Sequence, residues 1–236
     1  MVEYACKANV AIVKKRQGGF AVCMFFQRIK KLMTGHQKKK ALISQLTKAF
    51  PKHLAADVEV VCNALINTNE PRGYEFYIDN TTVWQLPSGD TVTVPYRLYI
   101  RDELDFPGRL TQQQKLIYHC ICSRSYNGYI RQKHVEALLY YDLPEWARPF
   151  VIKICDEYVI EILQIVYRKL KTKDCDQYKE ICALNIDYIK RAHSRMISYW
   201  SEFYRYDCFR YDDYIGKKLY AECFGYGKTG QKHIRF

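Results

Sequence analysis

The sequence has no uninterrupted run of 18 apolar residues, the length that a membrane-spanning helix needs, so it predicts no transmembrane segment. It also lacks a Cys-x-x-Cys spacing, which excludes the commonest thiol redox motif. Residues 225–230 resemble a phosphate-binding loop, but Glu222 stands where that motif requires its first glycine. No motif in the 236 residues therefore identifies a reaction.

A secretion signal is not predicted either. The apolar block at residues 20–26 is at the short limit for a signal peptide, its downstream flank is basic, and no small-residue cleavage site follows it. A disulfide framework is expected only of a secreted chain, so we expect the ten cysteines to be free. Several fall on apolar faces of predicted helices, where a thiol behaves as a small hydrophobic group. The sequence therefore favours a cytoplasmic location.

Positive charge is concentrated at the two ends of the chain, whose formal net charge is +12. Residues 1–53 hold twelve Lys or Arg and a single acid, Glu3. Residues 217–236 hold five Lys or Arg and a single acid, Glu222. Basic ends of this kind could bind phosphate backbones or anionic lipid. They could equally be solvated tails that promote solubility.

The charge distribution also predicts the domain organisation. Residues 1–32 form a basic N-terminal extension, and Met33 could be an alternative start. Residues 33–224 form a single globular domain, because a hydrophobic content of 48% is typical of a chain that buries a core. Residues 225–236 form a basic tail.

We expect a mainly α (α+β) fold, in which a small three-stranded antiparallel meander lies against a C-terminal multi-helix bundle. Residues 33–71 and 111–224 show the apolar spacing of helices. Residues 72–101 are rich in β-branched and aromatic residues between turn signals, as in short strands.

The three strands are predicted at residues 74–78, 81–86 and 91–94. Asp79-Asn80 and residues 87–90 are the turns between them.

The second half of the sequence carries signals for two helix starts and for one long helix. Thr111 and Gln114 have the spacing of a capping box, and Asn127 is a second expected N-cap. Residues 146–166 predict one strong helix, with Lys153, Asp156, Glu157 and Glu161 on its polar side.

The turn and helix at residues 127–139 resemble the second half of a HEAT-type repeat. Asn127, Ile130-Arg131 and Leu138 match that pattern, and His134 stands where the repeat has a small residue. The resemblance covers about one repeat, whereas a solenoid needs at least three. It implies a helix-hairpin geometry in which Arg131 holds neighbouring turns together.

A metal site is one interpretation of the histidines and cysteines. His119 and Cys122 share a helix face, and a zinc site would need further ligands from another element. Cys155, Cys182 and His193 could supply them. The default is that these side chains belong to the apolar core, so the sequence predicts no metal and no cofactor.

Four titratable side chains are candidates for catalysis: His134, Asp156, Glu157 and His193. The adjacent carboxylates could do acid–base work. Such a pair more often faces solvent or binds arginines, here Arg124, Arg131 or Arg148. A histidine on an apolar stripe is more often a hydrogen-bonded core residue.

Cations and aromatic rings share the helix predicted at residues 186–206, and these are the candidate binding residues: Arg191, Arg195, Trp200, Tyr204 and Arg205. Together they could bind a phosphorylated or nucleic-acid ligand. The alternative is helix packing, in which arginine stems cover the rings.

These patterns favour a cytosolic, non-catalytic interaction protein that binds another protein, or nucleic acid through its basic ends. The alternative is an enzyme with a polar pocket between the helices of the C-terminal bundle. That pocket would be lined by His134, Asp156, Glu157, His193 and Arg195. The sequence indicates no oligomeric state.

Overall fold

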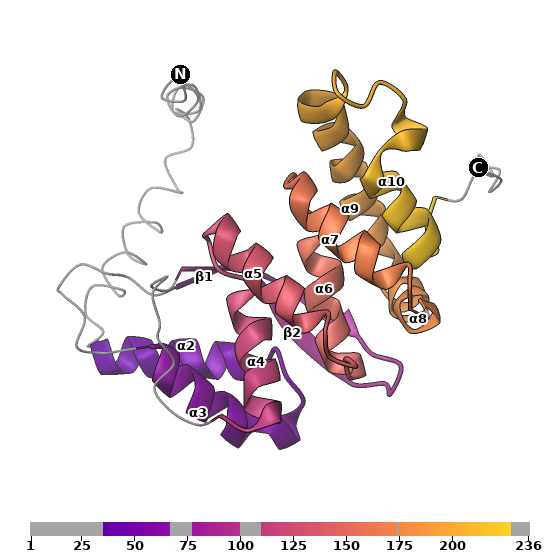
Figure 1. The fold of residues 1–236 in the computed structure, drawn as a ribbon. Coiled ribbons are helices and arrows are strands. Elements are labelled where there is room, and N and C mark those ends of the chain that lie inside the picture. Colours follow the sequence, from indigo (N-terminus) through magenta and orange to yellow (C-terminus); the bar gives the residue numbers. More distant parts are fainter. Residues whose placement is uncertain (1–34, 67–76, 100–109, 174, 228–236) are drawn as a thin grey trace, which may run out of the picture. The chain divides into compact units, whose positions relative to one another are not determined.

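The computed structural model describes residues 35–66, 77–99, 110–173 and 175–227 (Figure 1). The chain divides into two units, residues 1–38 and 39–236, and only residues 35–38 of the first are described, at the start of a helix. The predicted extension at residues 1–32 and the predicted tail beyond Gly227 lie outside the described residues.

The described residues are mainly helical and carry a small antiparallel sheet, which confirms the expected fold class in its coarse form. The first elements are α2 (Gly35–Thr47), α3 (Ala55–Leu65), β1 (Tyr77–Gln85) and β2 (Thr91–Tyr99). They are followed by α4 (Gln112–Cys122), α5 (Gly128–Leu138), α6 (Arg148–Ile154) and α7 (Ile160–Leu170). The last helices are α8 (Asp176–Leu184), α9 (Ile186–Tyr199) and α10 (Ile215–Lys218), and a π-helical segment, Trp200–Tyr204, extends α9.

The predicted meander is wrong in its number of strands, because the sheet of the described residues has two. The segments expected on either side of Asp79-Asn80 belong to one strand, β1, which pairs with β2 from Tyr77–Tyr99 to Gln85–Thr91. Asn80 has a φ of 52°, and its Oδ1 accepts a hydrogen bond of 2.7 Å from the amide of Thr81. Asparagine tolerates this left-handed conformation, so the strand continues through a sequence that resembles a turn. Residues 74–76 lie outside the described residues.

Both predicted helix caps are confirmed. The hydroxyl of Thr111 accepts from the amide of Gln114, and the side chain of Gln114 accepts in return from the amide of Thr111. The side chain of Asn127 accepts from the amide of Tyr129 at 3.0 Å. These caps satisfy amides that have no partner inside the helix, and they fix where α4 and α5 begin.

One core joins the hairpin and the helices on both sides of it. Phe50, which follows α2, packs its ring 5.5 Å from the rings of both Trp146 and Phe150. Along the hairpin, Trp84 and Val92 face each other and are fully buried. Their burial removes apolar surface from water, which is the main favourable contribution to folding.

Free cysteines line this core. Cys120, Cys155 and Cys182 are buried among apolar side chains, and the Cys155 thiol donates to the carbonyl of Val151 at 3.2 Å. Burial raises the pKa of the Cys62 thiol to about 12. These thiols are therefore packing groups held in the protonated form.

Within the described ranges, no helix combines the length and the apolar character needed to cross a membrane.

Candidate functional site

Two buried carboxylates, Asp156 and Glu157, lie in the loop between α6 and α7. Their exposed fractions are 1% and 2%. The sequence predicts a continuous helix here with both acids on its polar side, and that prediction is wrong because the helix ends at Ile154 and a new one begins at Ile160. Burying a charge without a partner is costly, so the geometry of this loop depends on the cations around it.

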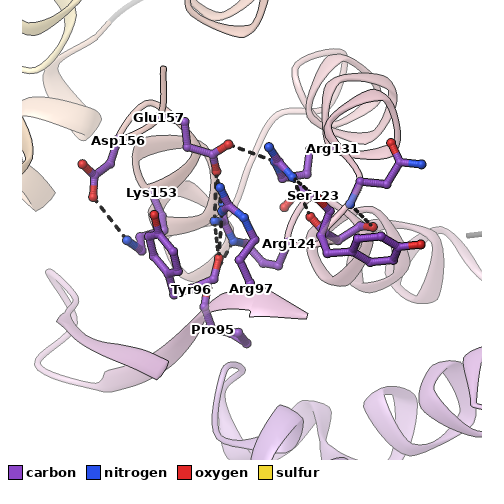
Figure 2. A network of polar contacts seen from close by, with 12 residues as sticks. Pro95, Tyr96, Arg97, Ser123, Arg124, Arg131, Lys153, Asp156 and Glu157 are labelled. Carbon is purple, nitrogen blue, oxygen red and sulfur yellow. Dashed lines mark hydrogen bonds and ion pairs between the residues drawn. The ribbon is translucent and has the colours of Figure 1, made fainter. Parts of the chain in front are cut away.

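Glu157 binds three arginines that come from three different elements. Its Oε1 lies 2.7 Å from Nη1 of Arg97 in β2 and 3.3 Å from Nη2 of Arg124, which follows α4. Its Oε2 lies 2.9 Å from Nε of Arg131 in α5. Figure 2 shows these side chains converging on one carboxylate. Of the two ordinary placements expected for this acid, facing solvent or binding arginines, the structure shows the second, with Arg124 and Arg131.

Arg124 is fully buried and connects the sheet to the helices. Its Nε donates to the carbonyl of Pro95 at 3.1 Å, and its Nη2 donates to the carbonyl of Tyr96 at 2.7 Å. Burial lowers the pKa of its guanidinium, and the charge of Arg97 adds to this effect, whereas Glu157 opposes it. The carbonyls of Pro95 and Tyr96, near the middle of β2, thus hold the buried guanidinium.

Arg131 holds the turn that precedes α5. Its Nη1 donates to the carbonyls of Ser125 and Tyr126 at 2.9 and 2.7 Å. Those residues also join the sheet, because the amide of Tyr126 donates to the carbonyl of Leu98 at 3.0 Å. Arg131 thereby supports the contact between this turn and β2.

Asp156 has a separate set of partners. Its carboxylate accepts from Nζ of Lys153 at 3.3 Å, from the hydroxyl of Tyr188 at 2.8 Å and from Nε of Arg195 at 2.7 Å. A second bond from Nη2 of Arg195 makes the arginine contact bidentate. The hydrogen bond to Asp156 raises the pKa of the Arg195 guanidinium. The acid thus ties α6 to α9.

Lys153 lies between two aromatic rings at the end of α6. Its Nζ is 4.4 Å from the ring centre of Tyr96 and 5.0 Å from that of Tyr188, and the residue is 2% exposed. Burial, together with the charge of Arg124, lowers the pKa of this amine to about 8, although Asp156 opposes the shift.

A polar pocket of about 720 Å³ opens beside Asp156 and its partners. One wall is β1 at residues 79–83, and the other is the junction of α8 and α9 at residues 184–188. Its cationic lining consists of Lys153, Arg191 and Arg195.

Asn185 fixes the two walls of this pocket relative to each other. Its Oδ1 accepts from the amide of Gln85 at 2.9 Å, and its Nδ2 donates to the carbonyl of the same residue at 2.9 Å. Trp84 packs beside them, with its ring centre 4.6 Å from that of Tyr188.

The five residues of the predicted catalytic pocket do not meet in one place. Asp156 and Arg195 are bonded to each other, while Glu157 belongs to the arginine cluster. His193 lies 3.2 Å from the hydroxyl of Tyr211, and its ring meets those of Tyr220 and Tyr226 edge-on. Because Tyr226 is half-buried in this way, the predicted start of the tail at Gly225 falls within packed structure.

His134 pairs with His119 instead. Their Nδ1 atoms are 2.9 Å apart, so one ring donates a proton and the other accepts it. Burial, with a contribution from His119, lowers the pKa of His134 to about 3. His119 lines a second cavity of about 950 Å³.

The predicted metal ligands are dispersed through the core. Cys122 is buried, and its raised pKa, about 12, is due mainly to desolvation. Among the residues that the structure describes, no three of His, Cys, Asp or Glu come close enough together to hold a metal ion.

Of the predicted binding residues, Arg191 and Arg195 share the pocket and the other three lie elsewhere. Trp200 donates from its ring nitrogen to the carbonyl of Cys208 at 2.9 Å. The hydroxyl of Tyr204 donates to the carbonyl of Tyr158, and its ring stacks 5.9 Å from that of Tyr214. Arg205 is exposed, with its guanidinium 6.0 Å from the ring of Tyr206.

Lys153, Tyr96 and Tyr188 are site residues that were not predicted from the sequence. The spacing of Lys153 and Asp156 places them one turn apart on a helix, which was a usable sign of an ion pair. The two tyrosines carry no such sign, because they reach the site from β2 and α9.

Comparison with known proteins returns no similarity: no protein family, no curated protein and no solved structure matches this chain.

Proposed function

We propose that this chain is a binding protein for a small phosphorylated ligand, which it holds in the pocket between β1 and the α8–α9 junction. The observation that carries the proposal is the cationic lining made by Lys153, Arg191 and Arg195. A volume of about 720 Å³ lies within the range of small-molecule sites, roughly 300–1,000 Å³. Arginine and lysine are the side chains that most often bind phosphate.

The charge behind the pocket supports an anionic ligand. Five cationic side chains contact Asp156 and Glu157, namely Arg97, Arg124, Arg131, Lys153 and Arg195. Two carboxylates cannot neutralise five cations, and charges act strongly where water is excluded. The excess positive charge therefore favours an anion at the neighbouring pocket.

Two acids at the pocket oppose this attraction only weakly. Asp79 and Asp187 contribute to the lining, but both are exposed. Asp187 also lies 3.6 Å from Nζ of Lys190, which partly neutralises it. Exposed charges are screened by salt, whereas buried ones are screened much less.

Arg191 and Arg195 would contribute to phosphate binding in different ways. Arg191 is exposed and makes no hydrogen bond or ion pair with the described residues, so its whole guanidinium is free to bind phosphate. Arg195 uses Nε and Nη2 for Asp156, and its Nη1 takes no part in those bonds. Asp156 thereby orients a guanidinium at the pocket in advance of binding, which reduces the entropy lost when a ligand is bound.

Calorimetric titration with inorganic phosphate and with pyrophosphate tests the proposal. We expect saturable binding that weakens by about tenfold or more in Arg191→Gln, because a charge-assisted hydrogen bond contributes roughly 1.5–3 kcal/mol. Arg205→Gln is the matched control, since it removes an exposed arginine that follows the same helix and lies outside the pocket. Equal affinity in the wild type and in Arg191→Gln, or no heat of binding to either anion, would contradict the proposal.

A second candidate function, protein binding, is favoured by an exposed group of aromatic side chains. This aromatic surface consists of Tyr158, Tyr199 and Phe203, whose rings lie within 6.4 Å of one another. Tyr206 and Phe209, which follow Phe203 in the chain, are 90% and 83% exposed. Aromatic residues are enriched at protein interfaces because each buries a large area at low entropic cost.

The occupant that we propose for the aromatic surface is a second copy of the chain. Arg205 and Arg210 lie among Glu202 and Asp207 in this segment, and all four are exposed. A surface that carries both charges can pair with itself across a two-fold axis.

Sedimentation equilibrium over a range of protein concentrations tests this second function. We expect a dimer that Phe203→Ser dissociates and that Tyr129→Ser leaves intact, since Tyr129 is 85% exposed on another helix. A monomer at every concentration would contradict it. Nucleic-acid binding through the basic ends stays a prediction, because most of those ends lies outside the described residues.

A further inference from the structure

Lys153 differs from the other cations of the pocket in its surroundings. It is 2% exposed, whereas Arg191 is exposed and the Arg195 side chain is 41% exposed, yet all three line the same pocket. Two tyrosine faces enclose its amine. A lysine that is buried and yet lines a cavity has the environment of a nucleophilic amine.

The charged groups that face this amine come from several elements. Asp156 from the α6–α7 loop is 3.3 Å away and favours the ammonium form. Arg124 from the end of α4 and Arg195 from α9 oppose it, and burial opposes it most. The rings of Tyr96 and Tyr188 complete the surroundings.

Together these effects lower the pKa of Lys153 enough that part of its amine is neutral near pH 7. With a pKa of about 8, roughly a tenth of the amine is neutral at pH 7, against less than about a thousandth for an ordinary lysine. Neutral lysine amines attack carbonyl carbons to form Schiff bases.

We propose that Lys153 forms an imine with an aldehyde or ketone carbon of the phosphorylated ligand, whose phosphate is held by Arg191 and Arg195. This inference rests on the proposed phosphate site and adds a carbonyl group to the definition of the ligand.

The reaction is a condensation that needs no oxidant or reductant. The lone pair of Nζ attacks the carbonyl carbon and gives a carbinolamine. The carbonyl oxygen then leaves as water, carrying the two hydrogens of the neutral amine, and a carbon–nitrogen double bond remains. The rings of Tyr96 and Tyr188 cover the nitrogen and limit the access of bulk water, which slows hydrolysis of the imine.

Reductive trapping on the full chain tests the imine directly. Pyridoxal 5′-phosphate supplies an aldehyde with a phosphate. 5′-Deoxypyridoxal supplies the same aldehyde without one, and it lacks the free 5′-hydroxyl that closes pyridoxal into a cyclic hemiacetal. Sodium borohydride reduces any imine to a stable amine, which peptide mass mapping assigns to individual lysines. This measurement needs no variant and therefore does not depend on a substituted protein folding.

We expect Lys153 to be the first lysine labelled by the phosphorylated aldehyde, and to be labelled about tenfold or more slowly by 5′-deoxypyridoxal, because the arginine contacts are then lost. Pyrophosphate should protect it. Lys169 is the matched control, since its amine also lies over a ring, 3.9 Å from the centre of Tyr140, but it does not line the pocket. Its labelling should respond to neither the phosphate group nor pyrophosphate.

The pH dependence of labelling distinguishes the buried amine of Lys153 from the amines of exposed lysines. Labelling of Lys153 should rise with pH, reach half of its maximum near pH 8 and level off above about pH 9, whereas labelling of exposed lysines should continue to rise beyond pH 10. Labelling of exposed lysines ahead of Lys153 would overturn the proposal.

Failure of the imine and failure of the phosphate site give different results. Calorimetric phosphate binding without labelling of Lys153 overturns the imine and leaves the binding function. Labelling of Lys153 at equal rates by the two aldehydes, with no calorimetric phosphate binding, overturns the phosphate site and with it the proposal as stated. Lys153→Arg keeps the charge, so it should bind phosphate and form no adduct at position 153.

Discussion

Asp156 and Glu157 are adjacent in the chain, yet their carboxylates bind separate sets of cations. Figure 2 shows Glu157 with its arginines and Asp156 with Lys153. Glu157 joins the end of β2 to α4 and α5, and Asp156 joins α6 to α9. A buried ion pair adds little stability compared with an apolar replacement, but removing one partner alone is costly. The pair therefore fixes the positions of five cations and makes the fold sensitive to losing either acid.

Glu157→Gln should lower the free energy of unfolding by about 3–5 kcal/mol, because three guanidinium groups lose the only carboxylate that pairs with them among the described residues. Urea denaturation followed by circular dichroism measures the loss. Glu161→Gln removes an exposed acid at the start of α7 and should change stability by less than about 0.5 kcal/mol. Similar effects from the two substitutions would show that the cluster is not coupled to folding.

The paired histidines predict loss of stability in acid. His134 has a pKa of about 3 in the folded chain, below its unfolded value of 6.5. Between these pH values the unfolded chain binds more protons, so stability falls as the pH drops from about 6.5 toward 3, by up to about 1.4 kcal/mol per pH unit. In His134→Gln this slope should flatten, and in His53→Gln, which alters an exposed histidine, it should not. The check is a series of urea melts from pH 7 to pH 4.

Gly216→Ala should destabilise the chain by about 1–3 kcal/mol through overpacking. A Cβ at this position would lie 2.6 Å from Cε1 of Tyr214 and 2.9 Å from Sδ of Met196. Gly128→Ala is the control, because its new methyl group would meet only Nη2 of Arg131, at an ordinary 3.6 Å. Thermal unfolding of the two variants measures the difference, and an equal effect would argue against close packing beneath α10.

Asn185→Ala should reduce both stability and phosphate binding. It removes two hydrogen bonds to the backbone of Gln85 that hold β1 against the α8–α9 junction, at a cost of about 1–3 kcal/mol. Asn63→Ala, at an exposed position in α3, is the control. Calorimetry on the folded variant should show weaker phosphate binding, and unchanged affinity would mean that the pocket walls are fixed by other contacts.

The helices and their caps could be predicted from the sequence because their signals are local. The capping box at Thr111 and the cap at Asn127 depend on residues within one turn, and both form as predicted. The strand count failed at Asn80 because the residue can adopt a left-handed backbone inside a strand as well as in a turn. Amino-acid composition alone does not distinguish a turn at Asn80 from a strand that continues through it.

The candidate site could be predicted only in part, for a physical reason. Arg191 and Arg195 were recognised because they lie one turn apart on a helix. The break after Ile154 was missed because apolar periodicity continues across it, and the energy that compensates the buried acids comes from distant cations such as Arg97 and Arg124. Those contacts are set by tertiary structure and leave no periodic pattern in the chain.

The buried cysteines give the molecule a set of internal reporters. Cys62 in α3, Cys120 in α4 and Cys182 in α8 are shielded from solvent and have raised pKa values, so an alkylating reagent reaches them only when the surrounding helix opens. Cys208 is only half-buried and serves as an internal reference for reagent access. The rate at which each thiol reacts would therefore map local unfolding along the chain, helix by helix, without any added label.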